Sequence, residues 1–126
     1  MRAIALFIAS SATIFIASPS RAQDAAAGEK VFTKCKVCHI ADQDQNKVGP
    51  SLHGVIGRTA GTHPGFTYSM AMNEAGKSGI KWDEPTLTKY LQDPRGMIKR
   101  TKMAFPGLKN DQDVANVIAY LKQFSK

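Results

Sequence analysis

The chain has 126 residues, which is enough for one small domain and too few for two. Its hydrophobic content of 43% is ordinary for a globular protein. With 17 Lys and Arg against 10 Asp and Glu the chain is basic, and it stays basic if Arg2 and Arg21 are lost with a leader. A moderate positive charge suits an acidic protein partner, nucleic acid or an anionic membrane surface, and composition alone does not choose among them.

Residues 1–22 are typical of a secretory signal peptide. Arg2 precedes a mostly apolar run from Ala3 to Ala17, and small residues surround the expected cleavage point after Ala22. The competing interpretation is a membrane anchor, but the apolar run is short and interrupted by hydroxyl residues. We therefore predict a mature domain at residues 23–126 that is exported to the periplasm.

The first predicted helix runs from Asp24 to about Lys36. Gly28, Phe32 and Cys35 lie at positions i, i+4 and i+7, so they share one stripe of this helix. A glycine on that stripe weakens the helix, and close approach of another helix would explain its presence. The alternative, which the sequence leaves open, is that the helix merely tolerates this glycine.

Three further helices are predicted from apolar periodicity, capping residues and proline. They cover residues 68–75 (Ser69 as cap, Gly76 as stop), residues 83 onward (opened by Asp83-Glu84-Pro85, closed by Pro94) and residues 111–124. The segments at 40–61 and 95–110 are expected to be irregular, and no alternating pattern predicts a sheet. The predicted fold class is all-α.

The motif Cys35-Lys36-Val37-Cys38-His39 is the attachment pattern of c-type haem. Each thiol can add to one haem vinyl group, and the imidazole of His39 can then ligate the iron. A zinc site would need two more ligands, but the chain has no other cysteine, and His53 and His63 lie too far apart for the usual histidine pair. A thioredoxin-like pair would need a βαβ setting. A disulfide across two residues closes too small a loop to stabilise much. The motif therefore predicts one covalently attached haem c.

The sixth position on such an iron decides between a carrier and a catalyst. An open position permits peroxide or gas chemistry, whereas a firmly held methionine excludes other ligands and raises the reduction potential. Met70 and Met72 lie in a predicted helix, where methionines usually fill the core. Met97 and Met103 both lie in the irregular segment. The residues alone make these two equally good candidates for the second iron ligand.

An ordered series of motifs covers nearly the whole predicted mature chain. It comprises Gly28-x-x-x-Phe32, Cys35-x-x-Cys38-His39, Gly49-Pro50-x-Leu52-x-Gly54, Gly57-Arg58, Gly65-Phe66-x-Tyr68, Trp82, Tyr90-Leu91, Thr101-Lys102-Met103-x-Phe105-x-Gly107 and Ile118-Ala119-Tyr120-Leu121. In this series of motifs the chain resembles the class I cytochromes c, and it is similar to bacterial cytochrome c2 and mitochondrial cytochrome c. The resemblance implies the cytochrome c fold, with crossing N- and C-terminal helices and with loops and short helices around one haem.

The resemblance also implies roles for single residues. Met103 would be the second axial ligand, opposite His39, and the carbonyl of Pro50 would accept the other ring proton of His39. Arg58, Tyr68 and Trp82 would surround the haem propionates, which need hydrogen-bond donors. The predicted haem pocket comprises Pro50, Arg58, Tyr68, Trp82, Tyr90, Thr101 and Phe105.

One segment departs from the family pattern, and two histidines have no counterpart in it. Pro-Gly often precedes Thr-Lys-Met in the family, whereas Lys99-Arg100 stands there in this chain, so we expect a more mobile ligand loop. His53 and His63 match no family ligand, and we interpret both as surface or loop residues.

The resemblance implies a soluble, monomeric one-electron carrier and not an enzyme. Basic residues would dock it transiently on acidic faces of membrane redox complexes: a quinol–cytochrome c oxidoreductase, a terminal oxidase, a reaction centre or a reductase. The predicted docking residues are Lys34, Lys47, Arg95, Lys102 and Lys109. Nucleic-acid binding is not expected, because no recognition motif accompanies the charge. The alternatives are a haem enzyme or sensor, such as a peroxidase or gas binder, and a membrane-tethered cytochrome subunit.

Overall fold

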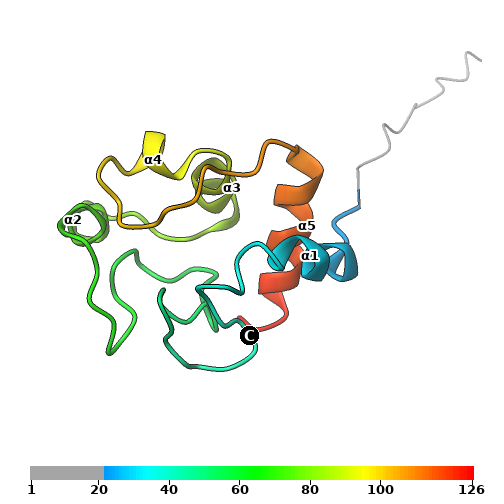
Figure 1. Cartoon of the computed structure of the whole chain (residues 1–126), viewed down its shortest axis with the longest axis horizontal. Coiled ribbons are helices and arrows are strands. Elements are labelled where there is room, and N and C mark those ends of the chain that lie inside the picture. The colour runs from blue at the N-terminus through cyan, green and yellow to red at the C-terminus, as the bar shows by residue number, and fades with distance from the viewer. Residues whose placement is uncertain (1–21) are drawn as a thin grey trace, which may run out of the picture.

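The computed structural model describes residues 22–126, and the predicted leader lies almost wholly outside the described residues. The described part contains the helices α1 (Ala25–Phe32), α2 (Met70–Lys77), α3 (Glu84–Gln92), α4 (Pro94–Met97) and α5 (Asp111–Lys122) (Figure 1). Within it, strand-like pairing is limited to one isolated antiparallel bridge between Thr59 and Lys81. The all-α prediction is confirmed.

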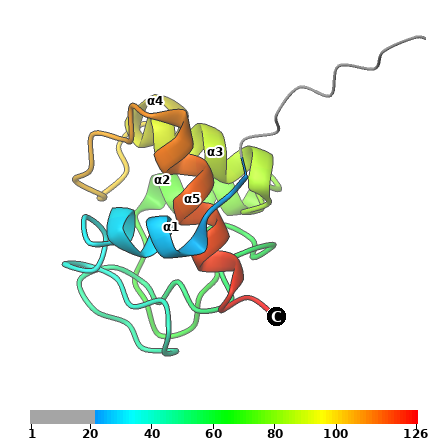
Figure 2. The ribbon, with the colours of Figure 1, turned by 90° about the vertical axis from the view of Figure 1, so that its right-hand side faces the viewer.

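The first and last helices cross closely at Gly28 (Figure 2). A Cβ atom on Gly28 would overlap the backbone carbonyl of Asn116 and would lie 2.9 Å from the Cβ of Tyr120. One turn further along α1, the rings of Phe32 and Tyr120 pack with their centroids 5.1 Å apart. Close approach of another helix is therefore the reason for this glycine.

Polar contacts hold the start of α1 against α5. The carboxylate of Asp24 caps α1 by accepting the backbone N–H of Ala26 at 2.9 Å, which satisfies one of the unpaired amides of the first turn. The backbone N–H of Asp24 donates to the buried side-chain oxygen of Asn116 at 3.0 Å, and Gln112 donates to the same oxygen at 2.9 Å. The helix crossing is therefore closed by hydrogen bonds as well as by apolar packing.

Two predicted helix ends are wrong. The helix α1 ends at Phe32, well before Lys36, because the chain tightens into turns in which Cys35 and Lys36 both donate to the carbonyl of Phe32. The helix α2 continues through Gly76 to Lys77, so that glycine is not a stop signal. A Cβ on Gly76 would overlap the carbonyl of Ala60. The loop that contains Ala60 therefore requires a glycine there.

The segment predicted as irregular after Pro94 begins with the short helix α4. Asp93 caps it by accepting the backbone N–H of Gly96 at 2.9 Å, so the proline that ends α3 also opens the next turn of helix. Further along, Arg100 has a backbone φ of 63°. Among residues 22–126 it is the one non-glycine residue in the left-handed region, where an L-residue is strained by about 1–2 kcal/mol.

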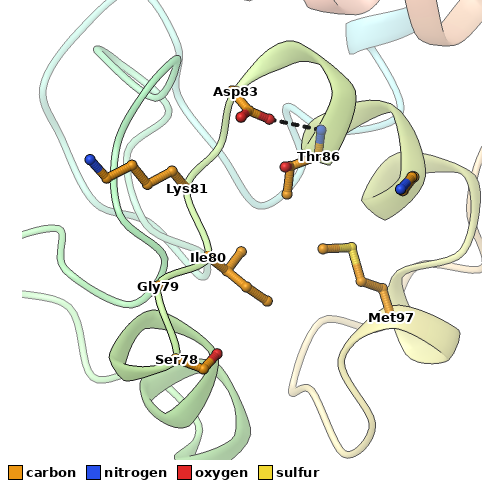
Figure 3. A pocket seen from close by; sticks show the side chains of 8 residues that line it. Ser78, Gly79, Ile80, Lys81, Asp83, Thr86 and Met97 are labelled. Atoms are coloured by element: carbon orange, nitrogen blue, oxygen red, sulfur yellow. Dashed lines mark hydrogen bonds between the residues drawn. The ribbon is translucent and has the colours of Figure 1, made fainter.

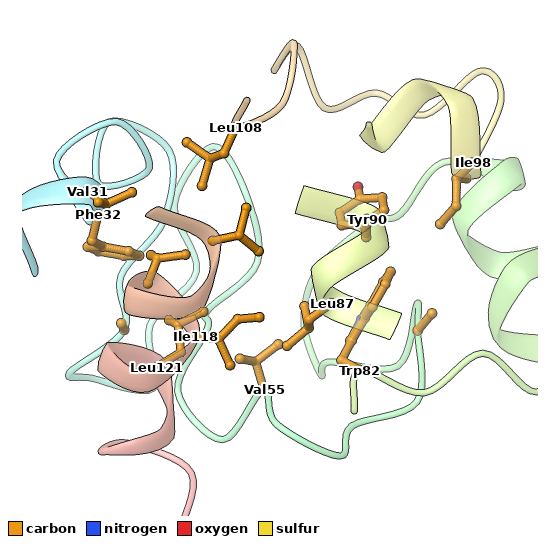
Figure 4. Close-up of a cluster of buried hydrophobic side chains, with 14 residues drawn as sticks. Val31, Phe32, Val55, Trp82, Leu87, Tyr90, Ile98, Leu108, Ile118 and Leu121 are labelled. Atoms are coloured by element: carbon orange, nitrogen blue, oxygen red, sulfur yellow. The ribbon is translucent and has the colours of Figure 1, made fainter. Parts of the chain in front are cut away.

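The buried side chains form one cluster with two parts (Figure 4). One part lies around α1 and α5 and includes Ile118, which is fully buried. The other part contains Trp82 and Tyr90, and Leu87 and Val55 lie between the two parts. None of the helices described at 22–126 is both long and apolar enough to cross a bilayer.

Replacing Gly28 by Ala should destabilise the protein by about 1–3 kcal/mol, because the new methyl group overlaps the backbone of α5. In an uncrowded helix the same change would stabilise by about 1 kcal/mol, so even the sign is informative. Denaturant unfolding measures the effect. The control is Glu29→Ala, which alters the neighbouring exposed position of α1 and should change the free energy of unfolding by less than about 0.5 kcal/mol. A stabilised Gly28→Ala variant would contradict the close crossing.

Candidate functional site

The cysteine motif forms a compact turn directly after α1. The backbone N–H groups of Cys38 and His39 both donate to the carbonyl of Cys35 at 3.0 Å, which brings the two cysteines and the histidine onto one turn of chain. Both thiols are free and half-buried. Burial raises the pKa of the Cys35 thiol to about 11, with Lys34 acting against this shift and Cys38 adding to it. The thiol is therefore protonated at neutral pH.

The imidazole of His39 is held in one orientation by the loop that follows. Its Nδ1 lies 2.8 Å from the carbonyl oxygen of Pro50, and the backbone N–H of Gly49 donates to the carbonyl of Cys38 at 2.8 Å. Burial lowers the pKa of His39, and the hydrogen bond to Pro50 only partly opposes this. The ring is therefore neutral at neutral pH and donates from Nδ1, which leaves Nε2 free to bind a metal.

Glycine at position 49 is a requirement of this arrangement. A Cβ on Gly49 would lie 2.7 Å from Nδ1 and 2.9 Å from Nε2 of His39, closer than such atoms normally approach. The backbone of Gly49 therefore forms one wall against the ring of His39.

Met103 is held by two residues of the predicted haem pocket, Tyr90 and Thr101. The phenol of Tyr90 donates to the sulfur of Met103 at 3.5 Å, and the backbone N–H of Met103 donates to the hydroxyl of Thr101 at 3.3 Å. Tyr90 is buried, and its ring lies 4.7 Å from that of Trp82, centroid to centroid. Burial raises the pKa of Tyr90, with the hydrogen bond to Thr101 opposing the shift, so the phenol keeps its proton for the sulfur.

Met97, the competing ligand candidate, lies in a different environment. It is at the end of α4 and lines a surface hollow of about 400 Å³ (Figure 3). The other residues of this hollow are Ser78, Gly79, Ile80, Lys81, Asp83, Thr86 and Lys89. Neither cysteine of the motif, nor His39, nor Tyr90 is among them. The two methionines, which the residues alone could not distinguish as ligand candidates, therefore have different surroundings in the structure.

The three residues expected around the propionates come together from separate segments. Arg58 and Trp82 are joined through the backbone, since Trp82 donates to the carbonyl of Arg58 at 2.8 Å. The guanidinium of Arg58 donates to the carbonyl of Ser51 at 2.7 Å, and burial lowers its pKa while the neighbouring Tyr68 opposes this shift. Tyr68 also accepts the backbone N–H of His63 at 3.2 Å. Their contact with propionates stays a prediction, as does the role of Phe105, which is half-buried against the core.

Sequence reasoning missed a histidine–carboxylate pair beside this group. Nε2 of His63 lies 3.1 Å from the carboxylate of Asp44, and the side chain of His63 is only 10% exposed. His63 is a loop residue, as expected, but its ring is largely buried, whereas His53 is exposed. Burial and the charge of Arg58 lower the pKa of His63, and Asp44 opposes them. No spacing rule connects residues in two separate loops, so the sequence carried no signal for the pair.

The five predicted docking residues, Lys34, Lys47, Arg95, Lys102 and Lys109, are all exposed. Two of them also support the structure. Lys47 donates from Nζ to the carbonyl of Lys36 at 2.8 Å, and Lys109 donates to the carbonyls of Gln92 and Pro106 at 3.2 and 3.1 Å. Their docking role stays a prediction.

The residues of the site fit a haem better than a metal ion bound by the protein alone. Within residues 22–126 no three His, Cys, Asp or Glu side chains are grouped to hold a metal ion, so the two cysteines gain no further ligand. The donors are instead two thiols, one neutral imidazole and one thioether, a set that suits haem c. Half-buried apolar side chains that pack against the core include Leu52, Ile56, Leu91 and Phe105.

Comparisons with known proteins agree with this donor set. A family model described as cytochrome c matches residues 25–125. The chain is 59% identical over 91 residues to cytochrome c2 iso-2 of Magnetospirillum fulvum, which covers 72% of this chain and 92% of that protein. It is 50% identical over 109 residues to cytochrome c2 of Blastochloris viridis, which covers 86% of this chain and 84% of that protein. The solved structure of cytochrome c2 from Rhodospirillum centenum superposes with a TM-score of 0.77 at 42% identity, over 82% of this chain and 99% of that one.

Replacing Gly49 by Ala should displace the ring of His39, because the added methyl group overlaps the imidazole. We expect a loss of about 1–3 kcal/mol in the free energy of unfolding, together with a shift of the His39 ring resonances in the NMR spectrum.

The matched control for this change is Gly54→Ala. Gly54 has a φ of 68° and nothing within 4 Å of its Cβ position, so it should lose about 1 kcal/mol through backbone strain alone and leave the His39 resonances in place. If the two variants gave the same His39 spectrum, the wall formed by Gly49 would not be what orients the ring.

Proposed function

This chain belongs to the cytochrome c family, and we propose that it is a soluble periplasmic one-electron carrier between membrane-bound redox complexes. The family match extends over residues 25–125, and the relatives named cytochrome c2 are electron carriers. The cofactor of the family is a covalently attached haem c. The observation that carries the proposal is the convergence of Tyr90 and Thr101 on Met103, because a methionine held in this way is suited to be a permanent ligand.

The proposed attachment uses the groups that the turn after α1 brings together. Cys35 and Cys38 would form the two thioethers, and His39 would ligate the iron through the free Nε2. When bound, the haem supplies an iron that alternates between the ferrous and ferric states. Pro50 keeps the ring of His39 in one tautomer and one orientation, so little has to rearrange when the charge on the iron changes.

Met103 would be the second protein ligand of the iron. Its sulfur accepts a hydrogen bond from Tyr90, and its backbone is tied to Thr101, so two contacts oppose its departure. An iron with both axial positions filled binds no peroxide or small gas readily. The proposal therefore favours a carrier over a haem enzyme or a gas sensor. On this view the chain converts no substrate.

The choice between Met103 and Met97 can be tested with two matched variants of the holoprotein. Met103→Ala should abolish the far-red methionine–iron charge-transfer band of the ferric protein and should allow the reduced protein to bind carbon monoxide. Met97→Ala should retain the band and exclude carbon monoxide, because Met97 lines a hollow away from Tyr90. Absorption spectroscopy measures both. Carbon monoxide binding by the reduced wild-type protein at neutral pH would support the sensor or enzyme instead.

The proposed partners are acidic faces of membrane complexes, met by a monomer in transient encounters. Lys34, Lys47, Arg95, Lys102 and Lys109 are exposed and positively charged, and they flank the segments that contain His39 and Met103. Charges of this kind raise the rate of encounter more than they tighten the complex, which suits a carrier that must leave quickly. The candidate complexes are a quinol–cytochrome c oxidoreductase, a terminal oxidase, a reaction centre and a reductase. We propose no nucleic-acid partner.

The periplasmic location depends on the proposed leader at residues 1–22. Cleavage after Ala22 would leave residues 23–126 as the mature domain, with transient contact to the membrane surface only. The intact mass of the exported protein should equal that of a chain starting at Gln23 plus one haem. A mass that retained residues 1–22 would support a membrane-tethered subunit, which is the remaining alternative.

A further inference from the structure

Gln23 would be the first residue of the mature chain once the leader is removed after Ala22. The residue is exposed, yet its side-chain amide is bound at both of its polar atoms. Nε2 donates to a carboxylate oxygen of Glu84, and Oε1 accepts a hydrogen bond from Nζ of Lys122 at 3.4 Å. Holding a long exposed side chain in one geometry costs conformational entropy. The proposed haem site does not explain why this glutamine is held.

The two groups that hold the amide come from different helices and pair with each other. Glu84 is the first residue of α3 and Lys122 is the last residue of α5, and Nζ of Lys122 donates to the second carboxylate oxygen of Glu84. Hydrogen bonds from Lys122 and from Gln23 lower the pKa of Glu84, so its carboxylate is ionised at neutral pH. We call Glu84 and Lys122 the N-terminal clamp. It presents a negative group to the nitrogen of the amide and a positive group to the oxygen.

The backbone beside Gln23 is anchored as well. The N–H of Asp24 donates to the side-chain oxygen of Asn116 at 3.0 Å, and this contact does not depend on the leader. Gln112 donates to the carbonyl of Ala22 at 3.3 Å, a contact that cleavage after Ala22 would remove. The α-amino group created by cleavage would therefore belong to a residue that follows no free tail and is held at its side chain and at the next backbone N–H.

A glutamine at the start of a chain can cyclise to pyroglutamate. Its α-amino nitrogen forms a bond with its own Cδ, the bond from Cδ to Nε2 breaks, and a five-membered lactam results. The departing nitrogen takes the proton that the α-amino group gives up and leaves as ammonia, so the reaction needs no oxidant and no second reactant. Since α-amino groups ordinarily have a pKa of about 8, part of this group is neutral and nucleophilic at neutral pH.

We propose that Gln23 is converted to pyroglutamate and that the N-terminal clamp promotes this cyclisation. The ammonium group of Lys122 faces Oε1, where negative charge develops when the amine adds to Cδ. The carboxylate of Glu84 faces Nε2, and it can accept a proton from the attacking amine and pass it to the leaving nitrogen. The lactam keeps the carbonyl oxygen that Lys122 binds, and the chain loses the positive charge of its amino terminus. The inference rests on the proposed cleavage after Ala22.

The test starts the cyclisation at a known time in purified holoprotein. A protease site placed directly before Gln23 makes it the first residue on cleavage, and no cyclising enzyme is present. Intact mass as a function of time measures the loss of ammonia. The clamp variants are Glu84→Gln and Lys122→Met. The matched controls are Glu74→Gln and Lys77→Met, which alter an exposed ion pair of α2 with an N–O distance of 3.0 Å.

Wild type and both controls should cyclise at one rate, about tenfold faster than either clamp variant. The factor is smaller than for a buried oxyanion hole because water reaches both clamp side chains. A peptide of residues 23–32 should cyclise as slowly as the clamp variants, since it lacks both groups. Gln23→Asn should lose no ammonia on this timescale, because its shorter side chain allows only a strained four-membered ring. Absorption spectra and denaturant unfolding of each variant distinguish loss of the clamp from loss of the fold.

The exported holoprotein provides the second measurement. Its intact mass should lie one ammonia below that of a chain starting at Gln23 plus one haem, which refines the mass expected for cleavage alone. Edman degradation should be blocked until pyroglutamyl peptidase removes the first residue. A mass that matches the open chain, with a readable first residue, would overturn the modification.

The kinetic outcomes separate the role of the clamp from the role of the leader. Equal rates in wild type and in the clamp variants would show that Glu84 and Lys122 do not promote the reaction. Faster cyclisation in the clamp variants would show that these contacts hold the amide away from the amine. An exported protein that retains residues 1–22 would overturn the cleavage itself. None of these results changes the far-red band that tests Met103, so the electron-carrier proposal stands or falls separately.

Discussion

The contact between the cysteine turn and the loop at Gly49-Pro50 fixes the orientation of His39, on which the proposed site depends. Two hydrogen bonds of 2.8 Å, from His39 to the carbonyl of Pro50 and from Gly49 to the carbonyl of Cys38, join the two segments. They set the tautomer of the imidazole and place the glycine backbone against its ring. A hydrogen bond of this kind contributes only about 1 kcal/mol to stability, so its importance lies in orientation more than in energy.

The two sides of the proposed iron site are built in different ways. On the histidine side the contacts are local, since Cys35, His39 and Pro50 are close in sequence and meet through short turns. On the methionine side the contact depends on tertiary structure, since Tyr90 reaches Met103 from α3. The histidine side is therefore built from neighbouring residues, whereas the methionine side requires α3 and the following loop to be in place.

This difference explains how much the sequence could predict. The cysteine motif could be interpreted from spacing alone, because one turn of chain defines its geometry. Met97 and Met103 could not be separated by spacing, because what distinguishes them is the phenol of Tyr90 and the hollow beside α4. On the sequence alone, only the family resemblance favoured Met103, and its role as a ligand stays a prediction.

The errors in the fold have a common physical origin. Glycine marks both helix ends and close approaches, and Gly76 serves the second purpose where the first was expected. Similarly, Pro94 ends α3 and opens α4, because its fixed φ suits the first turn of a helix. Local signals identify such a residue as special, but the partner that requires it, such as Ala60, lies elsewhere in the chain. The helix interiors, which depend on apolar periodicity, were predicted correctly.

The left-handed backbone of Arg100 bears on how firmly the proposed ligand Met103 would be held. Arg100 lies three residues before Met103, so the segment that would deliver the sulfur holds about 1–2 kcal/mol of strain that a glycine would not. Any state in which this segment swings away releases that strain. Relative to a chain with glycine there, the detached form is favoured by about 5- to 30-fold. If Met103 binds the iron as proposed, Arg100 would therefore influence how often that methionine leaves it.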